Sequence, residues 1–388
     1  MLLITDNRKK KPERIAVKNE NRVLALFYVV AIQPRPRHRQ LRDIKSVHFR
    51  RAKIKQFFTK PKIGLLLTGK NYNCLKSKVL FIINPISGGK KKDNVPELIE
   101  KNLDTNLFEP TIVFTNRAFH GHKLAAGGVG QYEYIIAVGG DGTVNEIASA
   151  IAGTDTVMGI IPFGSGNGLA RFLGIPMDTG QAIKALNDQK VEAIDAGKLN
   201  RQWFFNMAGM GFDAHIGEAF AHNTTRGFIT YIKVAFREIA NYKSELYHIE
   251  IDGKSYERDA FMLSFANSSQ YGNDAHVSPN ASVQDGLLDV CIIKPFPLYR
   301  FIGMGLRMFF KTADKSKYVE IIRGRNIKVK RTQEGPVHLD GEPQIMGMEA
   351  EIDVVPHALK IVTGKAFKGA TPVVETLNPD HEKLAVNE

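Results

Sequence analysis

The sequence predicts a two-domain protein in which an α/β domain precedes a mainly antiparallel β-sandwich domain. Two observations support the first domain: within residues 135–174, two apolar strand-like runs each enter a glycine-rich turn that continues as a helical pattern. A third supports the second domain, because from about residue 200 onward short strand-like runs separated by turn residues replace this alternation. The 388 residues, 43% of them hydrophobic, are enough for two cores of ordinary size.

The basic residues are concentrated at the N-terminus. Residues 1–78 carry 21 Lys and Arg against 4 Asp and Glu, whereas residues 79–388 carry 32 against 36, so the net charge of +13 arises from a basic leader. The leader suits an arm for an anionic membrane or nucleic acid, or else a disordered extension, which we favour. The boundaries that follow are leader 1–77, α/β domain 78–200, β-rich domain 201–365 and tail 366–388.

Cysteine use and hydropathy predict a cytoplasmic protein. Cys74 and Cys291 lie far apart and match no zinc or CxxC spacing, which indicates a reducing compartment. The longest apolar run, 23–32, is shorter than the roughly 20 residues that a membrane-spanning helix needs. No small-residue cleavage site follows it, so a signal peptide is not expected.

The first predicted strand, 79–83, ends in an NPISGG turn. Pro85 stiffens this turn, while Asn84, the Ser87 hydroxyl and the Gly88 amide offer hydrogen-bonding groups to a ligand. On its own the run would indicate only a turn.

The next elements continue the α/β alternation. A helix over 95–103 and a strand over 111–115 complete the first crossover, and the strand 135–138 then enters the GGDGT turn, which feeds a helical pattern with Val144, Ile147, Ala148 and Ile151 on one face. A strand over 157–161, a PFGSGNG turn and further helical and strand-like runs follow, at 169–173, 179–187 and 191–198.

Two glycine turns at the same end of neighbouring parallel strands form a crevice, which is where open α/β sheets bind ligands. Glycines let the backbone approach a phosphate, and a helix start offers unpaired N–H groups. Asp141 stands out among these amides. Its carboxylate is best explained if a divalent cation or a hydroxyl network lies between it and the phosphates.

The runs GGDGTVNE and PFGSGNGLAR resemble the diacylglycerol kinase catalytic-domain family, which includes sphingosine and ceramide kinases and is distantly related to NAD kinases. The resemblance implies ATP as co-substrate and Mg²⁺ as cofactor. It also implies a set of nucleotide-binding residues, namely Asn84, Pro85, Ser87, Gly88, Thr115, Gly139, Gly140, Asp141, Gly142, Thr143, Val144, Asn145 and Ser165.

A second acidic motif, HLDGEP, follows a predicted strand at 337–339. Two acids flanking a glycine can face one cleft, and their mutual repulsion raises the pKa of one of them, as suits a base. The motif resembles the family's LDGE signature, whose glutamate is the expected proton acceptor. Glu342 is therefore assigned as the catalytic base and Asp340 as its partner or as part of a metal network. Asp141 of the GGDGT turn is the third expected catalytic residue. A β-turn with solvated acids is the alternative.

Two further segments resemble family motifs. SVQDGLLD is similar to the magnesium-binding DGxLD segment, in which Asp285 and the carbonyls of Ser282 and Leu287 would bind the ion in a structural or a catalytic role. A plain turn is the alternative. In NMAGMGFDA, Asp213 matches an acid that faces the lipid head group in sphingosine kinases, although an aspartate there is also an ordinary helix cap.

One position departs from many bacterial members of the family, which carry an acid after the asparagine of the second glycine turn. Here Gly168 follows Asn167, a form that is closer to sphingosine and ceramide kinases. The lipid substrate therefore stays open.

The C-terminal half reads as strands at 204–206, 246–251, 255–266, 287–293, 319–322, 327–329, 337–339, 350–355 and 360–362, with helices over 214–243, interrupted at 224–227, and 298–311. Gly253-Lys254-Ser255 contains a GKS run but lacks the first glycine of a phosphate loop, so it is interpreted as a hairpin turn. The helix 298–311 interleaves apolar and basic residues. It suits a membrane interface, but a buried core helix is favoured.

These observations predict a lipid kinase that uses Mg-ATP to phosphorylate a hydroxyl of a diacylglycerol-like or sphingoid lipid. We expect peripheral association with the inner membrane surface, where the lipid substrate lies, and no nucleic-acid partner; a homodimer is left open. Two alternatives remain: an NAD kinase-like phosphotransferase, and a non-catalytic nucleotide or nucleic-acid binder that acts through the basic leader.

Overall fold

The computed structural model describes residues 76–89, 92–221 and 228–369. All of them fall within one compact unit, Asn71–Glu388. The predicted basic leader lies outside the described residues except for its last two positions, as do the expected helix interruption at 224–227 and most of the predicted tail.

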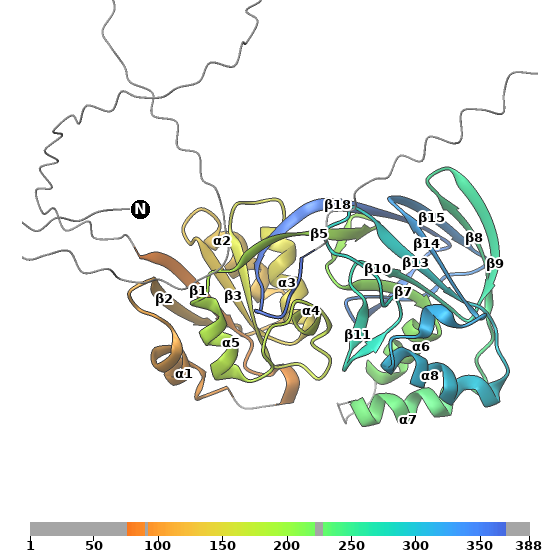
Figure 1. Cartoon of the computed structure of the whole chain (residues 1–388), viewed down its shortest axis with the longest axis horizontal. Helices are drawn as coiled ribbons and strands as arrows, with labels where there is room; N and C mark the ends of the chain where they lie inside the picture. Colours follow the sequence, from red (N-terminus) through yellow and green to blue (C-terminus); the bar gives the residue numbers. More distant parts are fainter. Residues whose placement is uncertain (1–75, 90–91, 222–227, 370–388) are drawn as a thin grey trace, which may run out of the picture. The chain divides into compact units, whose positions relative to one another are not determined.

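The N-terminal part is built on four parallel strands in the order β2-β1-β3-β4 (Figure 1). The helix α1 packs against α5, and α2 packs against α3; right-handed crossovers place these pairs on opposite faces of the sheet. The elements are β1 (Ser77–Ile83), α1 (Val95–Asn102), β2 (Phe108–Phe114), α2 (His120–Gly128), β3 (Tyr134–Gly139), α3 (Asp141–Ile151), β4 (Val157–Pro162), α4 (Gly168–Phe172) and α5 (Thr179–Leu186).

The strands form here because their sequences are almost continuously apolar. Residues 79–83 of β1 and 135–139 of β3 are buried throughout, as a parallel strand covered on both faces requires. The crossovers bring the carboxyl ends of all four strands, where the glycine turns begin, to one edge of the sheet.

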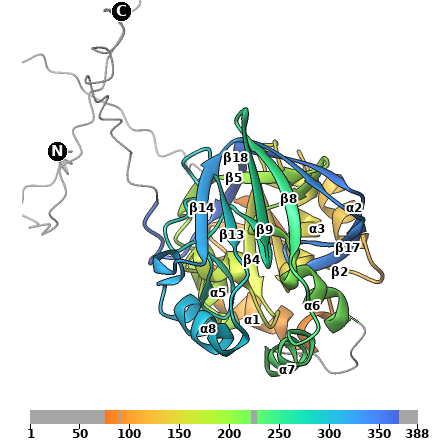
Figure 2. The same ribbon diagram turned by 90° about the vertical axis from the view of Figure 1, so that its right-hand side faces the viewer.

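The C-terminal part is a sandwich of two sheets. Six antiparallel strands form one layer in the order β14-β13-β10-β7-β16-β17, and β18, β15, β8 and β9 extend the N-terminal sheet to form the other (Figure 2). The strands are β5 (Val191–Leu199), β6 (Gln202–Phe204), β7 (Met207–Gly211), β8 (Glu245–Ile251), β9 (Lys254–Ala260), β10 (Met262–Ala266), β11 (Gln270–Gly272), β12 (Ala275–His276), β13 (Leu288–Ile293), β14 (Val319–Gly324), β15 (Asn326–Arg331), β16 (Gly335–Leu339), β17 (Glu342–Met346) and β18 (Glu349–Val362). Alternating residues from both layers, such as Ile249, Phe265 and Val329, form its core. The predicted fold class is therefore confirmed.

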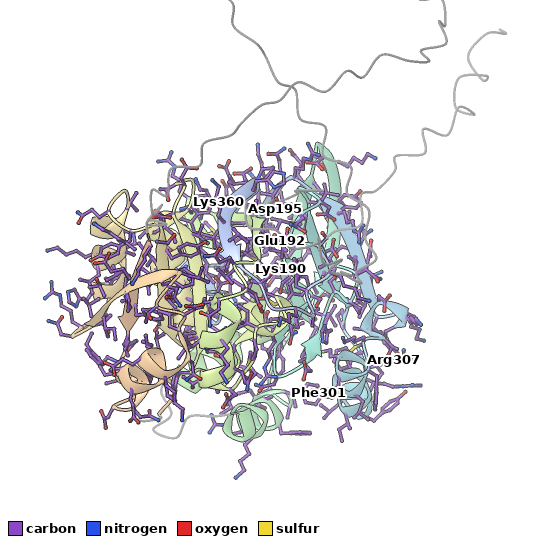
Figure 3. The ribbon with its side chains drawn as sticks, turned by 60° about the vertical axis from the view of Figure 1, so that its left-hand side comes forward. Lys190, Glu192, Asp195, Phe301, Arg307 and Lys360 are labelled. Carbon is purple, nitrogen blue, oxygen red and sulfur yellow. The ribbon has the colours of Figure 1, made fainter. Side chains whose placement is uncertain are left out.

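The long strand β18 belongs to both parts of the molecule. Its start pairs with β15 of the sandwich, and its end pairs in parallel with β4, where Lys360 lies opposite Val157. On its other edge, from Ile352 to Val362, it also pairs with β5; Figure 3 shows Glu192 and Asp195 of β5 beside Lys360 of β18. One continuous sheet thus connects the two parts.

Three helices lie at one end of the six-stranded sheet: α6 (Phe212–Ala221), α7 (Phe228–Glu238) and α8 (Phe301–Phe309) (Figures 1 and 2). The short 3₁₀ turns are η1 (Ser87–Gly89), η2 (Leu298–Arg300) and η3 (Ala313–Lys315). Aromatic contacts connect the helices, since the Phe301 ring lies 6.0 Å from Phe212 of α6 and 5.4 Å from Phe236 of α7.

Several predicted elements need correction. The run 255–266 is two strands, β9 and β10, which separate at Phe261 and enter different sheets. The runs 350–355 and 360–362 are one strand with a bulge. Of the strand predicted at 204–206, only Phe204 lies in a strand, at the end of β6, because residues 205 and 206 form a bend before β7. The predicted hairpin turn at Gly253 is confirmed between β8 and β9.

Candidate active site

Three glycine loops meet at the carboxyl ends of β1, β3 and β4. The Nδ2 of Asn84 donates to the Oγ1 of Thr143 at 2.9 Å, which ties the NPISGG loop to the GGDGT turn. Gly88 has a φ of +66°, and a methyl group on its Cα would lie 1.7 Å from the carbonyl oxygen of Phe163. Only glycine therefore lets the first loop approach the third this closely.

Two more of the expected nucleotide-binding residues, Gly140 and Thr115, lie in or beside these loops. A methyl group on Gly140 would lie 3.1 Å from the Cα of Gly164, so the second and third loops are also in close contact. The N–H of Thr115, at the end of β2, donates to the carbonyl of Ile83 at 2.9 Å. The side chain of Val144, in contrast, is buried in the core beneath the turn.

Asp141 fastens the second loop to the third. Its Oδ2 accepts the N–H of Asn167 at 2.8 Å and its Oδ1 accepts the N–H of Gly168 at 2.9 Å, at the start of α4. Asn167 in turn bonds the backbone of Gly164 through both its Oδ1 and its Nδ2. The carboxylate that seemed out of place in the sequence thus has two backbone partners that set the shape of the crevice.

The structure brings the LDGE motif to this crevice. Asp340 and Gly341, with φ of +49° and +88°, form the two-residue turn of the β16–β17 hairpin, and Glu342 opens β17. A methyl group on Gly142 would lie 2.3 Å from the Oε1 of Glu342. The exposed Glu342 carboxylate therefore lies directly against the start of α3.

Asp340 is buried and fully engaged. Its Oδ2 accepts the Nδ2 of Asn145 at 2.8 Å and the N–H of Phe205 at 2.9 Å, and its Oδ1 accepts the N–H groups of Asn206 and Met207. The alternative of solvated acids therefore holds for Glu342 only. Asp340 positions the hairpin, because it attaches the turn to α3 and to the segment that leads into β7.

Burial is the main electrostatic effect on the two inner acids. It raises the pKa of Asp141 to about 6, against the hydrogen bonds from Asn167 and Gly168, and the charge of Asp340 adds to the increase. Burial likewise raises the pKa of Asp340, while its four donors oppose this effect. The charge repulsion that the sequence suggested within LDGE thus acts between Asp340 and Asp141.

The segment around Asp285 forms a tight loop before β13. Its Oδ1 accepts the N–H of Leu287 at 3.1 Å, and the buried Asp195 accepts the N–H of Gly286 at 2.7 Å. Burial raises the pKa of Asp285, an effect that a bound cation would reverse. One carboxylate with the carbonyls of Ser282 and Leu287 gives oxygen-only ligands, which fit a hard cation.

Asp213 lies in a buried polar cluster at the start of α6. Its Oδ2 accepts the hydroxyl of Tyr271 at 2.7 Å and lies 2.9 Å from the Nε2 of His338, and its Oδ1 accepts the N–H of Ala214. The other ring nitrogen of His338, Nδ1, is buried without a hydrogen-bond partner. His338 stands two residues before Asp340, so this cluster is connected to the LDGE hairpin.

Four polar residues of this region were not among the predicted site residues: Asn167, Tyr271, Ser264 and His338. Asn167 lies within the quoted GSGNG run and His338 begins HLDGEP, so proximity to a motif could have indicated both. Tyr271 and Ser264 carry no local signal. Only the sandwich places them beside Asp213.

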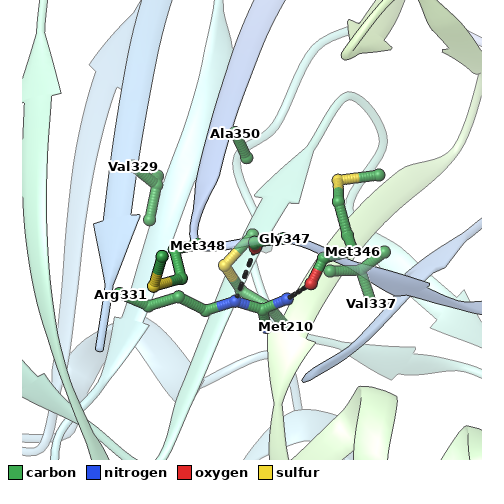
Figure 4. A pocket seen from close by; sticks show the side chains of 8 residues that line it. All are labelled: Met210, Val329, Arg331, Val337, Met346, Gly347, Met348 and Ala350. Atoms are coloured by element: carbon green, nitrogen blue, oxygen red, sulfur yellow. Dashed lines mark hydrogen bonds between the residues drawn. The ribbon is translucent and has the colours of Figure 1, made fainter. Parts of the chain in front are cut away.

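A small recess lies elsewhere in the sandwich, and Arg331 is one of the residues that line it (Figure 4). The guanidinium of this buried residue donates to the carbonyls of Gly335, Pro336, Met346 and Gly347. None of the residues that line the recess belongs to the glycine loops, so it is separate from the crevice.

Two features are absent from residues 76–89, 92–221 and 228–369. Within these ranges no three His, Cys, Asp or Glu side chains are placed to share a metal ion. In the same ranges no helix combines the length and apolar character needed to cross a bilayer.

Comparisons with known proteins agree with this architecture. The sequence profile of the diacylglycerol kinase catalytic domain matches residues 78–199, and that of the YegS C-terminal NAD kinase beta sandwich-like domain matches residues 206–363. A solved diacylglycerol kinase structure from Bacillus anthracis superposes with a TM-score of 0.59 at 22% identity, covering 75% of this chain and 98% of that one. At that identity the likeness concerns the fold alone.

Two curated relatives are similar over most of their length. The diacylglycerol kinase of Bacillus subtilis is 26% identical over 268 residues, which cover 68% of this chain and 88% of the relative. A YegS-like lipid kinase of Pseudomonas aeruginosa is 31% identical over 242 residues, 61% of this chain and 78% of the relative. Fold and matches first define a class: the enzyme is a kinase, a phosphotransferase. More specifically, the chain belongs to the diacylglycerol kinase catalytic-domain family, together with the YegS-like lipid kinases.

Proposed function

We propose that the chain transfers the γ-phosphoryl group of ATP to the hydroxyl of a diacylglycerol-like lipid. The observation that carries this proposal is the contact between Glu342 and Gly142, because it places a carboxylate at the glycine crevice where open α/β sheets bind nucleotides. Phosphoryl transfer to an alcohol needs a cradle for the phosphates and a carboxylate that accepts the hydroxyl proton.

Each part of the crevice has a role in this proposal. The backbone N–H groups at the start of α3 and in the glycine loops bind the phosphates, apart from those of Asn167 and Gly168, which donate to Asp141. Glu342 is exposed at their edge and accepts the proton of the lipid hydroxyl. Asp141 and Asp340, whose oxygens accept backbone N–H groups, hold the loops and the hairpin in register and are positioning residues.

A divalent cation fits the proposal through the Asp285 loop. Asp285, with the carbonyls of Ser282 and Leu287, would hold Mg²⁺, which would supply positive charge near the reacting phosphates or a structural clamp. Asp195 supports the loop by accepting the N–H groups of Gly286 and His357. A calorimetric titration with Mg²⁺ in which Asp285→Asn binds as tightly as the wild type would remove this loop from the proposal.

We place the lipid acceptor beside Asp213, which matches the acid that faces the lipid head group in sphingosine kinases. A diacylglycerol-like lipid is our first candidate, because a relative named diacylglycerol kinase is similar over most of this chain. A sphingoid base is the second, because Gly168 departs from the acid found in many bacterial members. A methyl group there would already lie 2.5 Å from the Nδ2 of Asn206 and 2.9 Å from the carbonyl of Tyr271, so this crevice excludes an acid at that position.

The test is a radiolabelled-ATP assay with diacylglycerol, ceramide, a sphingoid base and NAD as acceptors. We expect Glu342→Gln to lower kcat by about a hundredfold or more, with the KM for ATP unchanged, because the variant keeps its shape but cannot accept a proton. The matched control is Glu349→Gln, an exposed glutamate at the start of β18. Wild-type turnover by Glu342→Gln would remove it from the role of base, and NAD as the acceptor in place of every lipid would overturn the lipid proposal.

A further inference from the structure

The segment formed by η2 and α8 exposes an unusual amount of apolar surface. Only Met304 of α8 is buried, which corrects the expectation of a buried core helix. Six large apolar side chains of the segment are at least 40% exposed: Leu298 (57%), Tyr299 (76%), Ile302 (61%), Leu306 (51%), Phe309 (40%) and Phe310 (73%). We call these six residues the α8 apolar face.

The opposite side of α8 is also apolar and fixes the helix to the protein. Met304 and Met308 pack into the cluster around β10 and β13, and Phe301 packs against the cluster of α6 and α7. Residues 302 and 306 are one helical turn apart and therefore lie on one side. A helix that is apolar on both sides needs a second apolar environment for its outer side.

The charges around this face indicate what that environment is. Residues 298–317 carry five exposed basic side chains against the single acid Asp314, whereas residues 79–388 as a whole are slightly acidic. The five are Arg300, Arg307, Lys311, Lys315 and Lys317. Figure 3 shows Arg307 projecting outward from α8. Apolar side chains bordered by cations are complementary to an anionic bilayer surface, with acyl chains beneath negative head groups.

The face continues toward the expected lipid side of the active site. Phe236 of α7 is 51% exposed, and its ring contacts Phe301. Phe301 also contacts Phe212, which directly precedes Asp213. A bilayer that covered α8 would thus lie beside α6 and α7, and therefore near Asp213, where we place the lipid acceptor.

We propose that the α8 apolar face, with Phe236 and the bordering cations, docks the enzyme on an anionic lipid bilayer. The apolar side chains enter the boundary between head groups and acyl chains, and Arg300, Arg307 and Lys311 contact the head groups. The biological purpose of this docking rests on the proposed lipid kinase function. The binding test does not, because vesicle binding is measured without kinase activity.

The test is cosedimentation of the full chain with vesicles of phosphatidylcholine, with and without phosphatidylglycerol. We expect the wild type to bind the mixed vesicles more tightly than neutral ones. The apolar triple variant Ile302→Ser/Leu306→Ser/Phe310→Ser should bind both kinds of vesicle about tenfold or more weakly than the wild type. The charge triple variant Arg300→Gln/Arg307→Gln/Lys311→Gln should lose about tenfold or more in affinity for the mixed vesicles alone. The matched control, Leu246→Ser/Ile345→Ser, removes exposed apolar side chains from the sandwich and should bind as the wild type does.

Activity separates this proposal from the kinase proposal. With a short-chain diacylglycerol dissolved as monomers, both triple variants should turn over as fast as the wild type, while turnover of vesicle-borne lipid falls. Undiminished vesicle binding by both triple variants would overturn the docking proposal. So would a wild-type dimer that Ile302→Ser/Leu306→Ser/Phe310→Ser dissociates without a change in vesicle binding, because a second copy would then cover the face. Failure of the wild type on every soluble lipid would instead contradict the proposed function.

Discussion

The absence of a side chain at Gly142 leaves room for the carboxylate of Glu342, the proposed base. A methyl group there would lie 2.3 Å from the Oε1 and 3.0 Å from the carboxyl carbon of Glu342, the far end of an exposed and flexible side chain. Gly142→Ala should therefore displace the carboxylate at little cost in stability, and alanine even favours the helix α3 by up to about 1 kcal/mol. We expect kcat to fall about tenfold or more while the melting temperature stays equal or rises.

The matched control for this substitution is Gly127→Ala. Gly127 also lies in a helix, α2, and a methyl group on it meets nothing within 4 Å. It should gain helix propensity and keep full turnover. If Gly142→Ala turned over like this control, the contact with Glu342 would not matter for the reaction.

The raised pKa of Asp141 predicts a pH-dependent stability. The unfolded chain has an Asp pKa of about 3.9, so between about pH 4 and pH 7 the folded protein must ionise a group that resists ionisation. The stability contributed by the protonated acid is complete below about pH 4 and is lost as the pH rises through about 6. Asp141→Asn cannot ionise, so the stability of the wild type relative to this variant should fall over that range by on the order of 2 kcal/mol.

Urea unfolding at several pH values measures this difference. Asp93→Asn, at an exposed aspartate outside the crevice, is the control and should follow the wild type throughout. A constant difference between wild type and Asp141→Asn from pH 4 to pH 7 would contradict the raised pKa.

The site could be predicted in part at this scale. The two acidic motifs were expected to share one crevice, and the structure does place Glu342 against Gly142. The bracing roles of Asp141 and Asp340 could not be predicted, because their partners are backbone N–H groups of distant segments. Backbone groups leave no signature in a sequence.

At the scale of elements, the β16–β17 hairpin places the two acids of the LDGE motif in different environments. Asp340 accepts four hydrogen bonds in a buried position, so Asp340→Ala leaves three backbone N–H groups without a partner and should destabilise the protein by about 3 kcal/mol. Glu342→Ala removes an exposed side chain and should change stability by less than about 0.5 kcal/mol. Both variants should lose activity.

Urea denaturation of the two variants, with the kinase assay alongside, checks this distinction. Glu342→Ala serves as the internal control, because it has the same turn and a native fold. Equal stability of both variants would mean that Asp340 does not anchor the hairpin.

Periodicity predicted the elements whose environment is simple. The buried strands β1, β3 and β4 were expected within two residues of their bounds, because a strand covered on both faces is apolar throughout. The exposure of the helix predicted over 298–311 could not be predicted. This helix has two apolar sides, and the sequence does not say which of them the rest of the protein covers. The run 255–266 failed for a similar reason, because nothing local marks Phe261 as the point where the chain changes sheets.

At the scale of the whole molecule, the N-terminal and C-terminal parts have a strand and part of a hydrophobic core in common. The strand β18 pairs with β15 in the sandwich and with β4 in the parallel sheet. Its residues Leu359, Ile361 and Val362 belong to the same apolar core as β1 and β3. The segment after β6 is shared in the same way, because Asp340 of the sandwich bonds both Asn145 of α3 and the N–H of Phe205.

This sharing predicts that the described part of the chain unfolds as one cooperative unit. The single tryptophan, Trp203, lies at the junction: its carbonyl accepts the Nδ2 of Asn145, and its ring stacks on Phe205. Urea unfolding followed by tryptophan fluorescence and by far-ultraviolet circular dichroism should therefore give coincident transitions. A fragment of residues 76–199 should fail to unfold cooperatively, because it lacks β18 and leaves the edge of β4 and part of the core uncovered. Two separated transitions in the intact chain, or a cooperative fragment, would show that the two parts fold independently.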